Sequence, residues 1–287
     1  MSTIKRFEST PTQFQNVGDI RIAYREIGTA SGVPVIFLNH LGAVLDNWDP
    51  RVVDGIAAKH RVIVFDNRVI VFDNRGIGAS GGLTPDTIEA MARDTIAFIR
   101  ALGFKQVDLL GFSLGGMVSQ VIAALEPQLV RKMILAGTGP AGGVGIDKVT
   151  QVTIVDMLRG YLTFKDPKQY LFFTTTANGR QESGKFIKRL KERTEDRDKP
   201  ISVRSFRTQL KAIHAWGVQQ PTDLSIIRQP IFIANGDQDR MVPTSNTFDL
   251  AKRLPNSEIK IYPDAGHGGI FQFHNEFIAQ ALEFLAR

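Results

Sequence analysis

The sequence contains no cysteine. This absence excludes disulfide bonds, thiol nucleophiles and metal sites built on cysteine. No stretch reaches the roughly 18 consecutive apolar residues of a membrane-spanning helix, and residues 1–15 lack the apolar run of a secretory signal. We therefore expect a cytoplasmic protein that has no membrane partner.

The chain also lacks a large excess of charge of one sign, because its 287 residues carry a net charge of only +6. The excess lies in residues 180–211, which hold eleven lysines and arginines against five acidic residues. A nucleic-acid surface would interleave these charges with stacking aromatics, yet only Phe186 and Phe206 occur there. We predict a solvent-exposed helical face and no nucleic-acid partner; steering of anionic substrates is the alternative.

Short apolar runs alternate with amphipathic stretches over most of the chain. We expect buried strands at residues 33–38, 107–110, 131–136 and 230–235. We expect helices at residues 84–102, 113–125, 245–254 and 276–286. Alternation of this kind predicts an α/β fold with a mostly parallel sheet that is covered by helices on both faces.

The alternation stops between about residues 137 and 222, where amphipathic and charged stretches occur without buried strand patterns. The glycine-rich segment 139–145 is typical of a hinge. We therefore predict a core formed by residues 1–138 and 226–287, with residues 139–225 inserted as a helical cap.

A tandem repeat interrupts the first core segment: RVIVFDN occurs at residues 61–67 and again at residues 68–74. A strand needs only one copy, and either copy offers the same side chains. The second copy runs directly into the glycine-rich segment 75–80, whereas a strand in the first copy would crowd its carboxyl end with the surplus residues. Because ligand sites lie at the carboxyl ends of parallel strands, we predict that the second copy forms the strand.

The strongest local motif is Gly-Phe-Ser-Leu-Gly at residues 111–115, which follows an apolar strand and begins a helix. A serine in such a turn is pushed out of the sheet, and the helix N-terminus offers N–H donors to an oxyanion. We predict that Ser113 is a nucleophile. A chance glycine-rich turn is the alternative.

A nucleophilic serine needs a base, and of the five histidines His267 has the best position. It lies in a loop after a predicted strand, at the same sheet edge as Ser113. His214 could line the pocket or pack at the surface. The acid that orients the histidine is expected in the segment Gly-Asp-Gln-Asp, where either Asp237 or Asp239 could serve.

The serine, aspartate and histidine segments, in this order, resemble the α/β-hydrolase superfamily. Within it they resemble the cofactor-free haloperoxidases (perhydrolases), 3-oxoadipate enol-lactonases and related carboxylesterases. The resemblance implies a mostly parallel eight-stranded sheet with an inserted helical cap, and it assigns the catalytic acid to Asp239. The family's oxyanion loop is only partly matched by Asn-His-Leu-Gly at residues 39–42. Alignment on Trp48 makes the backbone N–H groups of Leu41 and Leu114 the expected oxyanion donors.

We therefore expect a serine carboxylic-ester hydrolase that acts on small esters or lactones, with peracid formation as a side activity. Trp216 and Val242 are candidates for lining its pocket, and core packing is the alternative for both. No cofactor or metal motif is present in the sequence. The other hypotheses are C–C bond hydrolysis, cofactor-free lyase or dioxygenase chemistry, and a non-catalytic ligand receptor. A homodimer is a candidate assembly.

Overall fold

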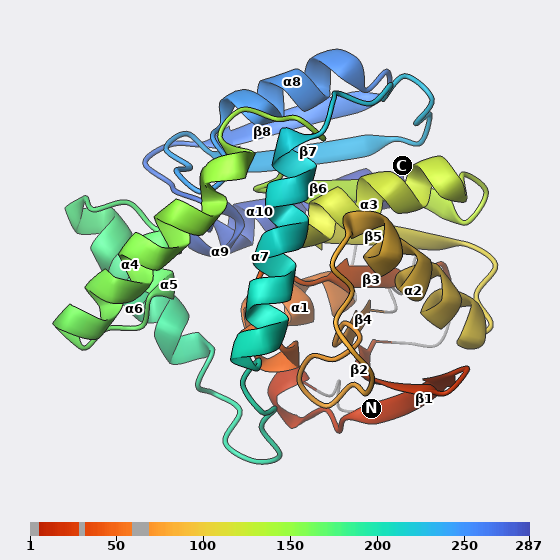
Figure 1. Cartoon of the computed structure of the whole chain (residues 1–287), viewed down its shortest axis with the longest axis horizontal. Helices are drawn as coiled ribbons and strands as arrows, with labels where there is room; N and C mark the ends of the chain where they lie inside the picture. Colours follow the sequence, from red (N-terminus) through yellow and green to blue (C-terminus); the bar gives the residue numbers. More distant parts are fainter. Residues whose placement is uncertain (1–5, 29–31, 59–68) are drawn as a thin grey trace.

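An eight-stranded sheet forms the centre of the computed structural model, which describes residues 6–28, 32–58 and 69–287 (Figure 1). The strand order is β1-β2-β4-β3-β5-β6-β7-β8. The strands are β1 (Gln13–Val17), β2 (Ile20–Ile27), β3 (Val35–Leu38), β4 (Val69–Phe72), β5 (Val107–Phe112), β6 (Val130–Ala136), β7 (Ile231–Gly236) and β8 (Ser257–Tyr262). The β1–β2 and β2–β4 pairs are antiparallel and the others are parallel. The predicted mostly parallel sheet is confirmed.

Helices cover both faces of the sheet, because the central strands are apolar on both sides. In β3, Ile36 and Leu38 belong to one hydrophobic cluster, while Val35 and Phe37 belong to the other. Side chains of α2 (Ile88–Ala101), α3 (Leu114–Leu125) and α8 (Ser245–Arg253) complete the first cluster. Side chains of α1 (Pro50–Ala57), α9 (Gly269–Gln272) and α10 (His274–Ala286) complete the second. No helix among the described residues combines the length and hydropathy needed to cross a bilayer.

The strand formed by the tandem repeat is β4, and it lies in the second copy, as predicted. It inserts between β2 and β3, with Phe72 opposite Tyr24 and Val71 beside Phe37. The first copy, residues 61–67, lies outside the described residues. Directly after β4, the Asp73 carboxylate accepts the backbone N–H groups of Leu45 and Ala79 at 2.9 and 3.0 Å. The second copy therefore places the glycine-rich turn correctly at the carboxyl edge of the sheet.

Four helices and a short 3₁₀ helix lie between β6 and β7, in the span predicted as a cap. They are η3 (Ile146–Lys148), α4 (Val149–Thr163), α5 (Lys168–Phe172), α6 (Ala177–Arg189) and α7 (Val203–Val218). All of residues 139–225 are described, and none of them forms a strand. In Figure 1, α4, α5 and α6 gather at the left of the molecule, while α7 crosses in front of the sheet.

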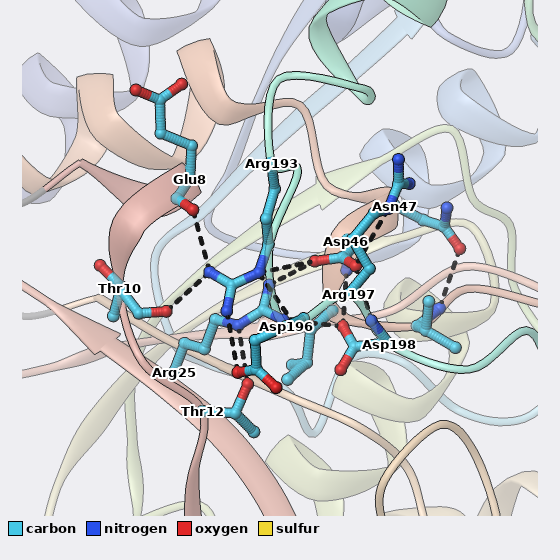
Figure 2. Close-up of polar contacts among 12 residues, drawn as sticks. Glu8, Thr10, Thr12, Arg25, Asp46, Asn47, Arg193, Asp196, Arg197 and Asp198 are labelled. Atoms are coloured by element: carbon cyan, nitrogen blue, oxygen red, sulfur yellow. Dashed lines mark hydrogen bonds and ion pairs between the residues drawn. The ribbon is translucent and has the colours of Figure 1, made fainter.

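A buried ion cluster fastens the connection between α6 and α7 to the sheet (Figure 2). The Arg25 guanidinium on β2 donates to Asp46 at 2.6 Å and to Asp198 at 2.9 Å, and all three side chains are buried. Arg193 donates to the carbonyl oxygens of Glu8 and Thr10 at 3.0 and 2.8 Å. The cluster therefore ties three segments that are distant in the sequence.

This cluster corrects the prediction for the basic segment. Its charges were expected to be solvent-exposed, but Arg189 and Arg193 are buried. Arg189 forms an ion pair with Asp49 at 2.7 Å, and Arg193 lies 3.7 Å from Asp46. Their partners are about 140 residues earlier in the chain, so a local pattern could not show the pairing.

Replacing Arg25 by leucine should destabilise the fold strongly. The change leaves Asp46 and Asp198 buried together without their cation, and loss of one member of a buried pair typically costs about 3–5 kcal/mol. Burial, together with the neighbouring Asp46 carboxylate, already raises the pKa of Asp198 to about 6. We expect a loss of that size in the free energy of unfolding, measured by urea denaturation near neutral pH.

The matched control is Arg100→Leu. Arg100 forms an ion pair with Glu126 at 2.7 Å, nearly the same distance, but the pair is exposed. Exposed pairs contribute at most about 1 kcal/mol, so this variant should stay close to the parent. Equal losses in the two variants would show that the Arg25 cluster does not stabilise the fold.

Candidate active site

Ser113 occupies a strained turn between β5 and α3. Its φ is +56° and its ψ is −116°, a backbone conformation that residues other than glycine rarely adopt. The flanking glycines permit it: a Cβ on Gly115 would lie 2.1 Å from the Leu38 carbonyl oxygen, and one on Gly111 would lie 2.5 Å from the Gly115 oxygen. The Ser113 N–H donates to Ala136 at 2.9 Å. The turn expected from the pentad is therefore present.

His267 and Asp239 come together in the loops after β8 and β7. The His267 Nδ1 lies 2.7 Å from Asp239 Oδ2, and both side chains are buried. The other carboxylate oxygen of Asp239 accepts the N–H groups of Met241 and Val242 at 2.8 and 3.0 Å. A carboxylate only accepts, so Nδ1 carries the proton and Nε2 keeps its lone pair.

The contact with His267 also distinguishes between Asp237 and Asp239, the two candidates for the acid. Asp237 is exposed, and its Oδ1 accepts the N–H of Ala265 at 3.1 Å. It therefore braces the loop that precedes His267. Asp239 is the aspartate that orients the imidazole.

Ser113 and His267 border one cavity of about 340 Å³. Most of its other lining side chains are apolar: Leu41, Met157, Pro167, Leu171, Phe172, Ile201, Val203, Phe206 and Met241. The polar ones are His40, Thr153, Asp166 and Lys168. Residues of α4, α5 and α7 thus form much of the wall opposite the sheet. Among the described residues, no cluster of three or more histidines and carboxylates could hold a metal ion.

The expectation that Trp216 and Val242 line the pocket is wrong, because neither borders this cavity. Trp216 is buried in the hydrophobic cluster and donates its indole N–H to the Gly139 carbonyl at 3.2 Å. Val242 packs in the same cluster, while its neighbour Met241 reaches the cavity. Lining residues of α4 and α7, such as Met157 and Phe206, were missed. Their spacing is the same as that of core residues, so the sequence held no separate signal for them.

The expected oxyanion donors, Leu41 and Leu114, both lie close to Ser113 or to its cavity. Leu114 is the first residue of α3, beside Ser113, and Leu41 borders the cavity. Within the described ranges, no protein acceptor takes either backbone N–H. The next N–H, that of Gly42, is already donated to Gln209 Oε1 at 2.8 Å. This occupancy favours Leu41 over Gly42 as the second donor.

His40 orders the same loop and is unsuited to be the base. Its Nδ1 donates to the Leu41 carbonyl at 2.9 Å, and its ring packs edge-on against Phe112 and Phe172. Burial, and after it the charge of Lys168, lowers the pKa of His40 to about 3. The ring is therefore neutral throughout the physiological range and holds the Leu41 peptide in place.

The buried neutral imidazole of His40 should make stability depend on pH. Its folded pKa of about 3 lies below the ordinary 6.5, so between these values only the unfolded chain takes up the proton. Stability is fully present above pH 6.5 and declines as the pH falls toward 3, by up to about 1.4 kcal/mol per pH unit. Between about pH 7.5 and 5.5, urea denaturation should show about 1.4 kcal/mol more loss for the parent than for His40→Asn. Identical pH profiles for the two proteins would contradict this role.

Comparisons with known proteins identify the family of this chain. The model of a family described as alpha/beta hydrolase fold matches residues 33–273. A 2-hydroxy-6-oxononadienedioate/2-hydroxy-6-oxononatrienedioate hydrolase of Burkholderia vietnamiensis is 26% identical over 99% of each chain. The serine hydrolase BPHL of Mus musculus is 23% identical, over 94% of this chain and 84% of that one.

Among solved structures, an alpha/beta hydrolase fold protein from Chitinophaga pinensis superposes with a TM-score of 0.91. It is 35% identical and covers 98% of this chain and 99% of its own. Both kinds of comparison extend over nearly the whole chain, including the inserted helices. The chain therefore belongs to the alpha/beta hydrolase fold family, as its sequence predicts.

Proposed function

We propose that the protein is a serine hydrolase that cleaves small carboxylic esters or lactones through an acyl-enzyme. The observation that carries this proposal is the buried 2.7 Å contact between His267 and Asp239 at the cavity that Ser113 also borders. A histidine fixed in this tautomer presents a basic Nε2, which is what a serine hydroxyl needs to become a nucleophile.

In the proposed reaction, Ser113 Oγ attacks the substrate carbonyl while His267 Nε2 takes the hydroxyl proton. The carbonyl oxygen becomes an oxyanion, and the N–H groups of Leu41 and Leu114 stabilise it. His267 then gives its proton to the leaving alcohol, and the acyl group stays on Ser113. A water molecule, deprotonated by His267, attacks the acyl carbon and releases the acid.

The size and lining of the cavity favour substrates with small, apolar acyl groups. Its volume of about 340 Å³ is at the lower end of typical ligand sites, and its walls are mainly aliphatic and aromatic. We propose that α4–α7 act as the cap predicted from the sequence, since Met157 and Phe206 from these helices line it. With hydrogen peroxide in place of water, the same acyl-enzyme would yield a peracid, the side activity that the family resemblance implies.

C–C bond hydrolysis of a diketone is the second candidate, favoured by the similarity to the Burkholderia hydrolase over 99% of both chains. The two activities use the same nucleophile and base, so substrate profiling must separate them. Cofactor-free lyase or dioxygenase chemistry and a non-catalytic receptor remain as further alternatives.

A substrate panel tests the proposal: p-nitrophenyl acetate and butyrate, a small lactone, and a vinylogous 1,5-diketone. We expect turnover of the esters or the lactone, with one equivalent of p-nitrophenol released in a burst if deacylation is slower than acylation. Cleavage of the diketone alone would favour the second candidate. No turnover of any of them would favour the non-hydrolytic alternatives.

A further inference from the structure

Helix α4 has its polarity reversed. Its buried positions are Val149, Thr153, Asp156 and Gly160, which include a hydroxyl and a carboxylate. Its exposed positions include Ile154, Val155, Leu158, Tyr161 and Leu162, all large and apolar. A helix on the surface of a monomer normally buries the apolar side and exposes the polar one. The apolar outward side of α4 is therefore expected to pack against a binding partner.

We call these five outward residues the α4 stripe. Each of their side chains is more than half exposed, up to 78% at Tyr161, and Phe164 at the helix end is 97% exposed. Together, the α4 stripe and Phe164 present an apolar surface comparable to the ~800 Å² that each partner buries in a standard protein interface. Contiguous apolar patches of this size on soluble proteins mark interaction sites.

The order of residues in the α4 stripe indicates which partner it fits. The stripe is symmetric about Leu158: Ile154 and Leu162 lie four residues to either side, and Val155 and Tyr161 lie three. When two copies of such a helix cross antiparallel, Leu158 meets its own copy, Ile154 meets Leu162, and Val155 meets Tyr161. The α4 stripe is thus self-complementary, which is the property that an isologous two-fold interface needs.

We propose that the protein forms a two-fold symmetric homodimer through the α4 stripe, with Leu158 at the axis. The inward side of the same helix supplies Thr153 and Met157 to the cavity wall. The dimer would thus brace a helix that shapes the substrate cavity. Leu158 does not border the cavity, so dimerisation can be tested without altering the site.

Sedimentation velocity of the full chain tests the interface. The parent protein should sediment as a species with twice the 31.8 kDa mass of one chain. Leu158→Glu and Leu158→Lys should each be monomeric, because two like charges would meet at the axis. A matched control is Ile226→Glu, which places the same charge on another side chain that is 57% exposed but lies outside the stripe. This variant should remain dimeric.

A mixture of the two Leu158 variants provides the decisive test of the interface. Leu158→Glu and Leu158→Lys in equal amounts should recover the dimer, because opposite charges then meet at the two-fold axis. Recovery also shows that both variants are folded. A monomeric parent, a dimer unaffected by Leu158→Glu, or no recovery in the mixture would each overturn the proposal. Binding of a monomeric parent to lipid vesicles through the stripe would identify a lipid surface as the partner instead.

Discussion

Ser113→Ala is expected to lower kcat for p-nitrophenyl butyrate by about 10⁶-fold, the loss seen when a nucleophilic serine is removed from a comparable triad. The variant keeps the cavity and the oxyanion donors, so a small rate above the uncatalysed reaction should remain. Its KM should change little, because the hydroxyl contributes to bond formation more than to binding. Initial rates measured spectrophotometrically give both constants.

The matched control for this variant is Ser119→Ala. Ser119 lies on α3, the helix that follows Ser113, and is also buried; its hydroxyl donates to the Gly115 carbonyl at 2.8 Å. It does not border the cavity, so the same chemical change should leave kcat within a few-fold of the parent. A Ser113→Ala variant that retained the parent rate would refute the mechanism.

If the proposed mechanism holds, Asp239→Asn is expected to lower kcat by about 10⁴-fold, as the equivalent change does in a serine-protease triad. An asparagine can donate its amide N–H to His267 Nδ1, which would place the imidazole proton on Nε2. The histidine would then have no lone pair facing Ser113. The fold should survive, because the carboxamide oxygen can still accept from Met241 and Val242, which now donate to Asp239 Oδ1.

Asp237→Asn provides the control with the same loss of charge two residues away. Asp237 braces the loop through Ala265 but does not contact His267. Its kcat should fall far less than that of Asp239→Asn. If both variants lost activity equally, the loop as a whole, and not the orientation of His267, would limit catalysis.

The sheet and the Ser113 turn could be predicted because they depend on local chemistry. A parallel strand that is buried on both faces must be apolar throughout, as residues 35–38 are. A serine held at positive φ needs small flanking residues, which the glycines at 111 and 115 supply. The choice of β4 in the tandem repeat also came from its flank, since only the second copy leads directly into the glycine-rich turn.

The lining of the cavity could not be predicted for a physical reason. Pocket walls and cores both use apolar side chains at helical spacing, so Trp216 in the core and Phe206 in the wall have similar local patterns. Both residues lie on α7, so the difference depends on what each part of that helix packs against in the folded chain. The buried ion pairs are equally non-local, because Arg25 and Asp198 are 173 residues apart.

The most direct test of the proposed function is to locate a covalent label. A fluorophosphonate reacts with an activated serine, and peptide mass spectrometry identifies the modified residue. We predict one phosphonyl group per chain, on the peptide that contains Ser113, and no labelling of Ser113→Ala. Stoichiometric labelling of a different residue, or ester hydrolysis that continues undiminished after exhaustive treatment without label on Ser113, would contradict the assignment of Ser113 as the nucleophile.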